Sequence, residues 1–226
     1  MKAYQMKIMI KNSHPPIWRR CIVPAGLTFS QLSFLLNEIM GWFDNHLSMF
    51  EFYHLGIVLE DDPESLQWGN RKIMNAINTP IEPFMDTENW FTYIYDLGDY
   101  WEHHVEIEKV LSEYEYDYPM VLKYKGDTPY EDCGGIYGYY EKIEILENPK
   151  DPRYEEIKEW LDALPHITYD TDEVNEILKK YSLSEKTHAP MSRIEIYESC
   201  WNGEPLYTIA DVFDKKPERE EALLEE

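Results

Sequence analysis

The sequence predicts an α+β fold, in which one helix packs across an antiparallel or mixed sheet and a C-terminal helical region follows. Three observations predict this class. Apolar and polar residues alternate with the period of a half-buried strand through much of the first half of the chain. One helical stripe interrupts these strands after residue 28, and three more helical patterns follow residue 135. The resulting order strand, strand, helix, strand favours a helix packed across an antiparallel or mixed sheet.

The first three elements are two strands and a helix. Residues 4–10 alternate in polarity and are expected to form a strand, as are residues 17–23, after the turn at His14-Pro15-Pro16. Thr28 is placed to cap the helix, and Gly41 is placed to end it. The apolar stripe of this helix consists of Phe29, Leu32, Leu35, Leu36, Ile39 and Met40.

The next segment returns to strands. Residues 47–53 are expected to form a strand, and residues 57–59 extend it or form another. Residues 60–89 contain three prolines and two weak apolar patches, so we expect mostly loop with one short strand.

The strongest hairpin in the chain lies near its centre. In residues 90–95 the aromatic side chains alternate with Thr92 and Ile94. Residues 96–99, Asp-Leu-Gly-Asp, supply turn chemistry, and residues 101–108 then place apolar side chains on one face and acidic ones on the other. This alternation puts the ring of His103 on the apolar face.

The remaining residues are expected to form a loop, three helices and an extension. The loop at 117–135 contains a strand near residues 120–124. The three expected helices cover residues 136–147, 152–164 and 171–181, the last capped by Thr171-Asp172.

We therefore expect one domain at residues 1–181 and a C-terminal extension at residues 182–226. In that extension residues 182–190 form a linker, and Asn202-Gly203 is a favoured two-residue turn for a hairpin over 193–212. An acidic tail ends the chain.

Composition limits the function classes. The 226 residues include 21 Lys and Arg against 44 Asp and Glu, a net charge of −23, and 15% are aromatic. The aromatic content excludes a disordered chain. The charge argues against nucleic acid and anionic membranes as partners, and favours a basic protein partner. No apolar run approaches a membrane span and no signal peptide is evident, so we expect a cytoplasmic monomer or dimer.

Three ordered blocks resemble the plasmid pRiA4b ORF-3-like family over roughly residues 3–181. The central block is Tyr-Ile-Tyr-Asp-Leu-Gly-Asp-Tyr-Trp-Glu-His at 93–103. A second is Gly41-Trp42 followed by His46-Leu47 and Phe50, and a third is Pro-Tyr-Glu-Asp-Cys-Gly-Gly at 129–135 followed by Gly138-Tyr139. The third departs from the family pattern at Tyr130, where a second proline is usual.

The resemblance implies a compact sheet with helices packed on it. It implies no activity, because the family is essentially uncharacterised. Some members are labelled as passenger proteins of an insertion element, which implies an association with mobile elements.

The chemistry-bearing residues of these blocks form one candidate cleft if the blocks meet in space. Its members are His46, Asp96, Asp99, Trp101, His103, Glu131, Asp132 and Cys133. Carboxylates with an imidazole suit metal binding or general acid–base work. A structural alternative is favoured, because turn chemistry alone explains both aspartates. Aspartates in a turn cap backbone N–H groups, and His103 is then a buried histidine with a hydrogen-bond partner.

Two other features have structural explanations. Cys133 stands among carboxylates that raise the pKa of a thiol, so a buried, unreactive cysteine is expected. Trp18-Arg19-Arg20 is a compact basic cluster, and arginines flanking a strand are usually surface or ion-pair residues. No common metal-ligand spacing or cofactor motif is present.

Three functions remain open at this point. The first is a non-catalytic binding or interaction module, whose surface is the aromatic and acidic region around the hairpin and residues 129–135. The second is a metal-assisted or acid–base hydrolytic enzyme that uses Asp96, Asp99, His103, Glu131 and Asp132. The third is an accessory protein of a mobile element, which only the resemblance implies.

Overall fold

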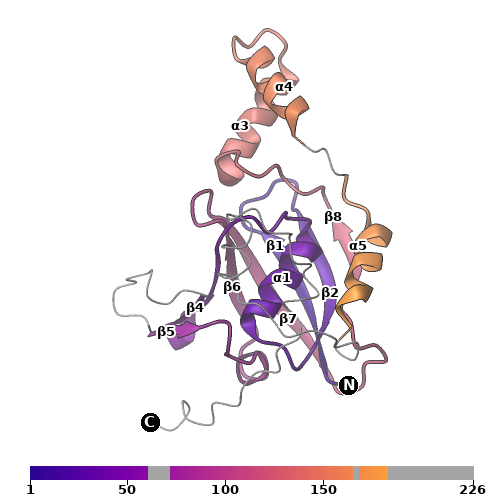
Figure 1. Cartoon of the computed structure of the whole chain (residues 1–226). Helices are drawn as coiled ribbons and strands as arrows, with labels where there is room; N and C mark the ends of the chain where they lie inside the picture. The colour runs from indigo at the N-terminus through magenta and orange to yellow at the C-terminus, as the bar shows by residue number, and fades with distance from the viewer. Residues whose placement is uncertain (61–71, 165–167, 183–226) are drawn as a thin grey trace, which may run out of the picture.

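The computed structural model describes residues 1–60, 72–164 and 168–182, and its centre is one eight-stranded sheet (Figure 1). The strands are β1 (Ala3–Ile10), β2 (Trp18–Pro24), β3 (Ser48–Phe52), β4 (Ile57–Glu60), β5 (Lys72–Asn75), β6 (Trp90–Tyr95), β7 (Trp101–Leu111) and β8 (Met120–Lys125). Their order is β5-β4-β3-β6-β7-β1-β2-β8. All neighbours are antiparallel except β4 and β5, so the sheet is mixed, and the α+β class is confirmed.

Helix α1 (Phe29–Met40) lies across one face of this sheet, as expected (Figure 1). The side chain of Thr28 accepts a hydrogen bond from the Gln31 N–H, and the Gln31 side chain accepts one from the Thr28 N–H. This reciprocal pair fixes the first turn. Gly41 ends the helix with φ 88°, a left-handed conformation that glycine adopts without a steric penalty.

The main core lies between α1 and the inward faces of the strands. It includes a group of packed rings: Phe29, Phe50, Phe52, Phe84 and Phe91. A polar network is buried beside them. The Tyr93 hydroxyl donates to Asn37 Oδ1 at 2.7 Å and lies 2.9 Å from the Ser33 hydroxyl. This pairing satisfies polar side chains of α1 that are buried against the sheet.

Three helices follow the sheet, as the sequence predicts. Helices α3 (Gly135–Glu147) and α4 (Tyr154–Ala163) stand away from the sheet, and α5 (Thr171–Leu178) returns to lie beside α1 and β8 (Figure 1). The expected cap of the last helix is wrong by one residue, because Asp170 accepts from the N–H groups of residues 172 and 173. Helix α4 begins two residues after Pro152, which lies in the preceding turn.

Other details depart from the sequence-based expectations. The segment expected to be mostly loop contains β5, as predicted, but also the short helix α2 (Glu82–Met85), whose Phe84 packs on Phe29. Arg19 is fully buried rather than at the surface, with its guanidinium carbon 3.6 Å from the centre of the Tyr169 ring. Arg20 does form an ion pair, with Glu108.

The expected linker, hairpin and acidic tail lie outside the described residues. None of the described helices combines the length and the apolar character needed to cross a membrane.

Candidate functional site

Three loops meet at one end of the sheet, and they carry the three sequence blocks. The first follows α1 and covers residues 41–47. The second is the turn between β6 and β7, and the third covers residues 126–134, between β8 and α3. The condition for a shared cleft, that the three blocks meet in space, is therefore met by these loops.

Glycine permits two of the close approaches between these loops. A Cβ on Gly41 would lie 2.5 Å from the Thr128 hydroxyl oxygen, and that hydroxyl donates to the Met40 carbonyl at 2.6 Å. A Cβ on Gly135, which has φ 65°, would lie 2.2 Å from the Asp99 carbonyl oxygen. Any larger residue at either position would separate the loops.

The contact between the loops brings one histidine among three carboxylates. His46 Nδ1 lies 3.8 Å from an oxygen of Asp96, and His46 Nε2 lies 3.5 Å from Asp132 and 3.7 Å from Glu131. One donor atom from each of His46, Asp96 and Asp132 falls within 4.8 Å of the others. We call these three residues the cation cluster, because their donor atoms lie close enough together that they could hold a metal ion.

The members of the cation cluster differ in exposure. The Asp96 side chain is 10% exposed and that of His46 is 27% exposed, whereas the Asp132 side chain is 74% exposed. The Asp96 carboxylate accepts from the Gly98 N–H at 2.9 Å, which holds it in place. The cluster thus has a fixed buried carboxylate at one side and a solvent-accessible one at the other.

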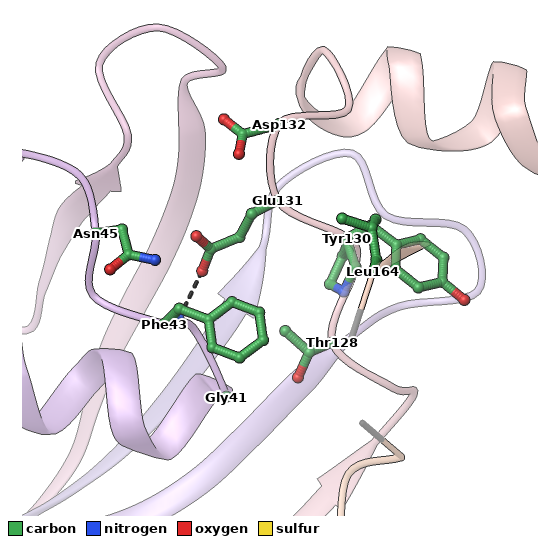
Figure 2. A pocket seen from close by; sticks show the side chains of 9 residues that line it. Gly41, Phe43, Asn45, Thr128, Tyr130, Glu131, Asp132 and Leu164 are labelled. Atoms are coloured by element: carbon green, nitrogen blue, oxygen red, sulfur yellow. Dashed lines mark hydrogen bonds between the residues drawn. The ribbon is translucent and has the colours of Figure 1, made fainter. Parts of the chain in front are cut away.

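Glu131 joins two of the loops beside the cation cluster (Figure 2). One of its oxygens accepts from the Phe43 N–H at 2.6 Å, and the other accepts from the Tyr95 hydroxyl at 3.2 Å. Burial raises the pKa of Glu131, and the two hydrogen bonds oppose that shift. Because it accepts a hydrogen bond from the Phe43 N–H, the Glu131 carboxylate positions the loop that carries His46.

The backbone at the cluster adopts an uncommon conformation. Asp96 has φ 58° and Asp132 has φ 54°, both in the left-handed region that aspartate tolerates better than most residues. Asp44 and Tyr100, in the same two loops as His46 and Asp96, also have φ 58°. Such residues are enriched at binding and catalytic sites, where the surrounding structure holds them.

His103 does not belong to this site. It is 0% exposed, and its Nε2 accepts from the Trp42 indole N–H at 3.1 Å. The proton is therefore on Nδ1, which lies 3.2 Å from the Tyr93 carbonyl and donates to it. Burial lowers the pKa of His103 to about 4, so the ring is neutral at pH 7. His103 is therefore the buried, hydrogen-bonded histidine of the structural alternative, because its strand turns the ring into the core and away from the candidate cleft.

Three other candidates also have structural roles. Trp101 is 1% exposed and packs on Trp42 with ring centres 5.0 Å apart. An oxygen of Asp99 accepts from the Gly134 N–H at 2.9 Å, before the start of α3. Cys133 is buried, and burial raises the pKa of its thiol to about 12, so it is the unreactive cysteine that the sequence predicts.

Sequence reasoning missed the residues that connect these groups. The ring of Trp42 stacks on Tyr95 with centres 5.4 Å apart, and the Tyr95 hydroxyl accepts from the Asn45 N–H at 3.1 Å. Both aromatic residues lie within the family blocks, which was the one signal that could have identified them. Trp42 and Tyr95 thus link His103 in the core to the loops that carry His46 and Glu131.

The fold and the cluster define a class of α+β protein: one mixed sheet crossed by a helix, with a histidine–carboxylate cluster where its central hairpin turn meets two loops. Residues 2–177 match the family described as plasmid pRiA4b ORF-3-like protein. The chain belongs to this family, as its motifs indicate.

The chain is also similar to two individual proteins, neither of which has a known function. The chain is 34% identical over 157 residues to the uncharacterised protein y4hQ of Sinorhizobium fredii (strain NBRC 101917 / NGR234), a match that covers 69% of this chain and 79% of y4hQ. It is also similar to the crystal structure of MM3350, a protein of unknown function from Methanosarcina mazei Go1. That match has a TM-score of 0.64 and 30% identity, and covers 76% of this chain and 97% of MM3350.

Proposed function

We propose that this protein is a binding module that takes a divalent cation through His46, Asp96 and Asp132. The observation that carries the proposal is that these three side chains, from three loops, present donor atoms within 4.8 Å of one another. Imidazole nitrogen and carboxylate oxygen together suit Zn²⁺ and, less strongly, Mn²⁺.

The spacing supports a cation after a small adjustment. Zinc bound at about 2.0–2.2 Å from each ligand in tetrahedral geometry holds its donor atoms about 3.4 Å apart. His46 Nε2 lies 3.5 Å from Asp132 and His46 Nδ1 lies 3.8 Å from Asp96. Because one imidazole gives only one nitrogen to an ion, one of the two carboxylates must move closer from a separation of up to 4.8 Å. The Asp132 side chain is 74% exposed and is free to close on an ion, while Asp96 is held by the Gly98 N–H.

The charge of the site also supports a cation. Asp96, Glu131 and Asp132 all lie within 3.8 Å of the one imidazole, in a chain of net charge −23. A divalent ion would neutralise the carboxylates that gather there, which are otherwise mutually repulsive. The same surface suits the basic protein partner that the composition favours.

A binding function is better supported than an enzyme that uses Asp96, Asp99 and His103 for acid–base catalysis. His103 lies in the core with both ring nitrogens engaged, and the Asp99 carboxylate accepts from the Gly134 N–H. The thiol of Cys133, with a pKa of about 12, is a poor nucleophile at pH 7. An association with mobile elements stays a prediction from the family resemblance.

Isothermal titration of the full chain with Zn²⁺ tests the proposal. The titration is run with 150 mM salt, because screening suppresses weak binding to the acidic surface. We expect one site per chain, weakened about tenfold or more in His46→Ala and in Asp132→Asn. The matched controls are His104→Ala and Asp162→Asn, since the His104 ring contacts Trp90, away from the cluster, and Asp162 is an exposed residue of α4.

The controls decide the interpretation. They should bind zinc as the unchanged protein does, and circular dichroism should show every variant folded. Zinc binding that is equal in all five proteins, or absent from the folded unchanged chain, would contradict the proposal.

A further inference from the structure

A cavity adjoins the cation cluster (Figure 2). Its volume is about 320 Å³, and it lies between the loop after α1, the residues after β8 and the end of α4. It is lined by Gly41, Phe43, Asn45, Thr128, Pro129, Tyr130, Glu131, Asp132 and Leu164. A volume of this size falls at the lower end of the range for small-molecule sites, about 300–1,000 Å³.

The lining is divided into an apolar and a polar side. Phe43, Tyr130 and Leu164 supply the apolar side, and the Phe43 residue is 45% exposed although it is a large hydrophobic. Asn45 and the two carboxylates supply the polar side (Figure 2). Such a division suits a small molecule with an apolar ring or chain and one polar group.

Asp132 belongs both to the cavity lining and to the cation cluster. A ligand whose apolar part lies against Phe43 and Tyr130 therefore reaches the cluster with its polar end. Three protein donors leave at least one position of a zinc or manganese ion open for an exogenous oxygen. A carboxylate is a donor that either cation accepts.

We propose that this cavity binds a small organic acid, whose carboxylate completes the coordination of the cation and whose ring or chain packs on Phe43 and Tyr130. The inference rests on the proposed function, because the cation supplies the attraction. Without it, Glu131 and Asp132 face the ligand with like charge, and an anion is repelled. Binding of the acid should therefore depend on the metal.

Benzoate is the probe, and Mn²⁺ is the metal. Bound Mn²⁺ broadens the proton signals of a ligand in its coordination sphere, so the broadening of benzoate by the manganese-loaded full chain is measured against free Mn²⁺. Benzamide and benzylamine, which have the same ring with a neutral and a cationic group, are the matched ligands. Phe43→Ala tests the apolar side, with Tyr53→Ala as its control, because Tyr53 is 71% exposed in the turn after β3.

We expect benzoate to bind only to the manganese-loaded protein, with at least a tenfold loss of affinity in Phe43→Ala and none in Tyr53→Ala. Manganese binding itself, measured by titration, should be unchanged in Phe43→Ala. Manganese binding without benzoate binding would overturn this inference and leave the proposed function standing. Failure of manganese to bind would overturn this inference, and the zinc titration would then decide the proposed function separately. Binding of benzylamine to the metal-free protein, stronger than any binding of benzoate, would show a cation-binding cavity and overturn the inference.

Discussion

Replacing His103 by leucine should destabilise the fold without removing a ligand of the cation. The side chain is fully buried, and its ring bridges the Trp42 indole N–H and the Tyr93 carbonyl. Leucine fills a similar volume but leaves both groups without that partner. An unpaired buried polar group costs about 1–3 kcal/mol, so for these two groups we expect a loss of about 2–6 kcal/mol in the free energy of unfolding. That is a large share of the roughly 5–15 kcal/mol of a typical domain.

Urea unfolding at pH 7.5, followed by tryptophan fluorescence, measures this loss. His103→Gln should recover part of it, because an amide both donates and accepts. His46→Ala is the contrasting variant. Its imidazole is 27% exposed and lies 3.5–3.8 Å from its acidic partners, so we expect a change of no more than about 1 kcal/mol. A His103→Leu protein as stable as the unchanged chain, yet unable to bind zinc, would refute this assignment of the two histidines.

The remaining predictions concern pH, a thiol and a glycine. The folded pKa of His103 is about 4 against an ordinary value of 6.5, so the unfolded chain takes up the proton first. The free energy of unfolding should therefore fall by up to about 3 kcal/mol as pH is lowered from 6.5 towards 4. Urea unfolding of His103→Leu should not show this pH-dependent loss. Cys133, with its thiol pKa of about 12, should resist iodoacetamide at pH 7.5, as mapped by peptide mass spectrometry, and rapid alkylation of the folded chain would contradict its burial. Gly135→Ala should lower the melting temperature more than Gly56→Ala, because both have positive φ but only the first added methyl meets backbone, 2.2 Å from Asp99. Equal shifts would argue against that contact.

Local pattern was sufficient to predict most of the sheet and α1. Alternation located β1, β6 and β7, and the cap at Thr28 and the stop at Gly41 bounded the helix. The same alternation placed His103 with Trp101 and Val105, so its burial followed from the strand period. Helix α2 was missed because four residues are too few to show a helical period.

The error at Arg19 has a physical reason. The strand period puts this residue on the face of Cys21 and Val23, and both are buried. A buried guanidinium needs partners, and apart from the neighbouring Trp18 carbonyl these are distant in sequence. They include the carbonyls of Lys125 and Gly126 and the ring of Tyr169. No local pattern contains those partners, so the general expectation for arginine was misleading.

The candidate site was predictable in its residues but not in its grouping. Family motifs marked His46, Asp96, Glu131 and Asp132, and the structure brings these four together. It also separates His103 from them, although His103 stands in the same motif as Asp96. Which side chains meet depends on long-range loop contacts such as Gly41 with Thr128, which no period within a segment encodes.

Native mass spectrometry of the full chain, equilibrated with Zn²⁺ without chelator, tests the central claim most directly. Unchanged protein and His104→Ala should each carry one zinc ion per chain, and His46→Ala should carry none under the same conditions. The three proteins should otherwise give the same charge-state distribution, which shows that they are folded. One zinc ion per chain in His46→Ala, or none in the unchanged protein, would contradict a cation site formed by His46, Asp96 and Asp132.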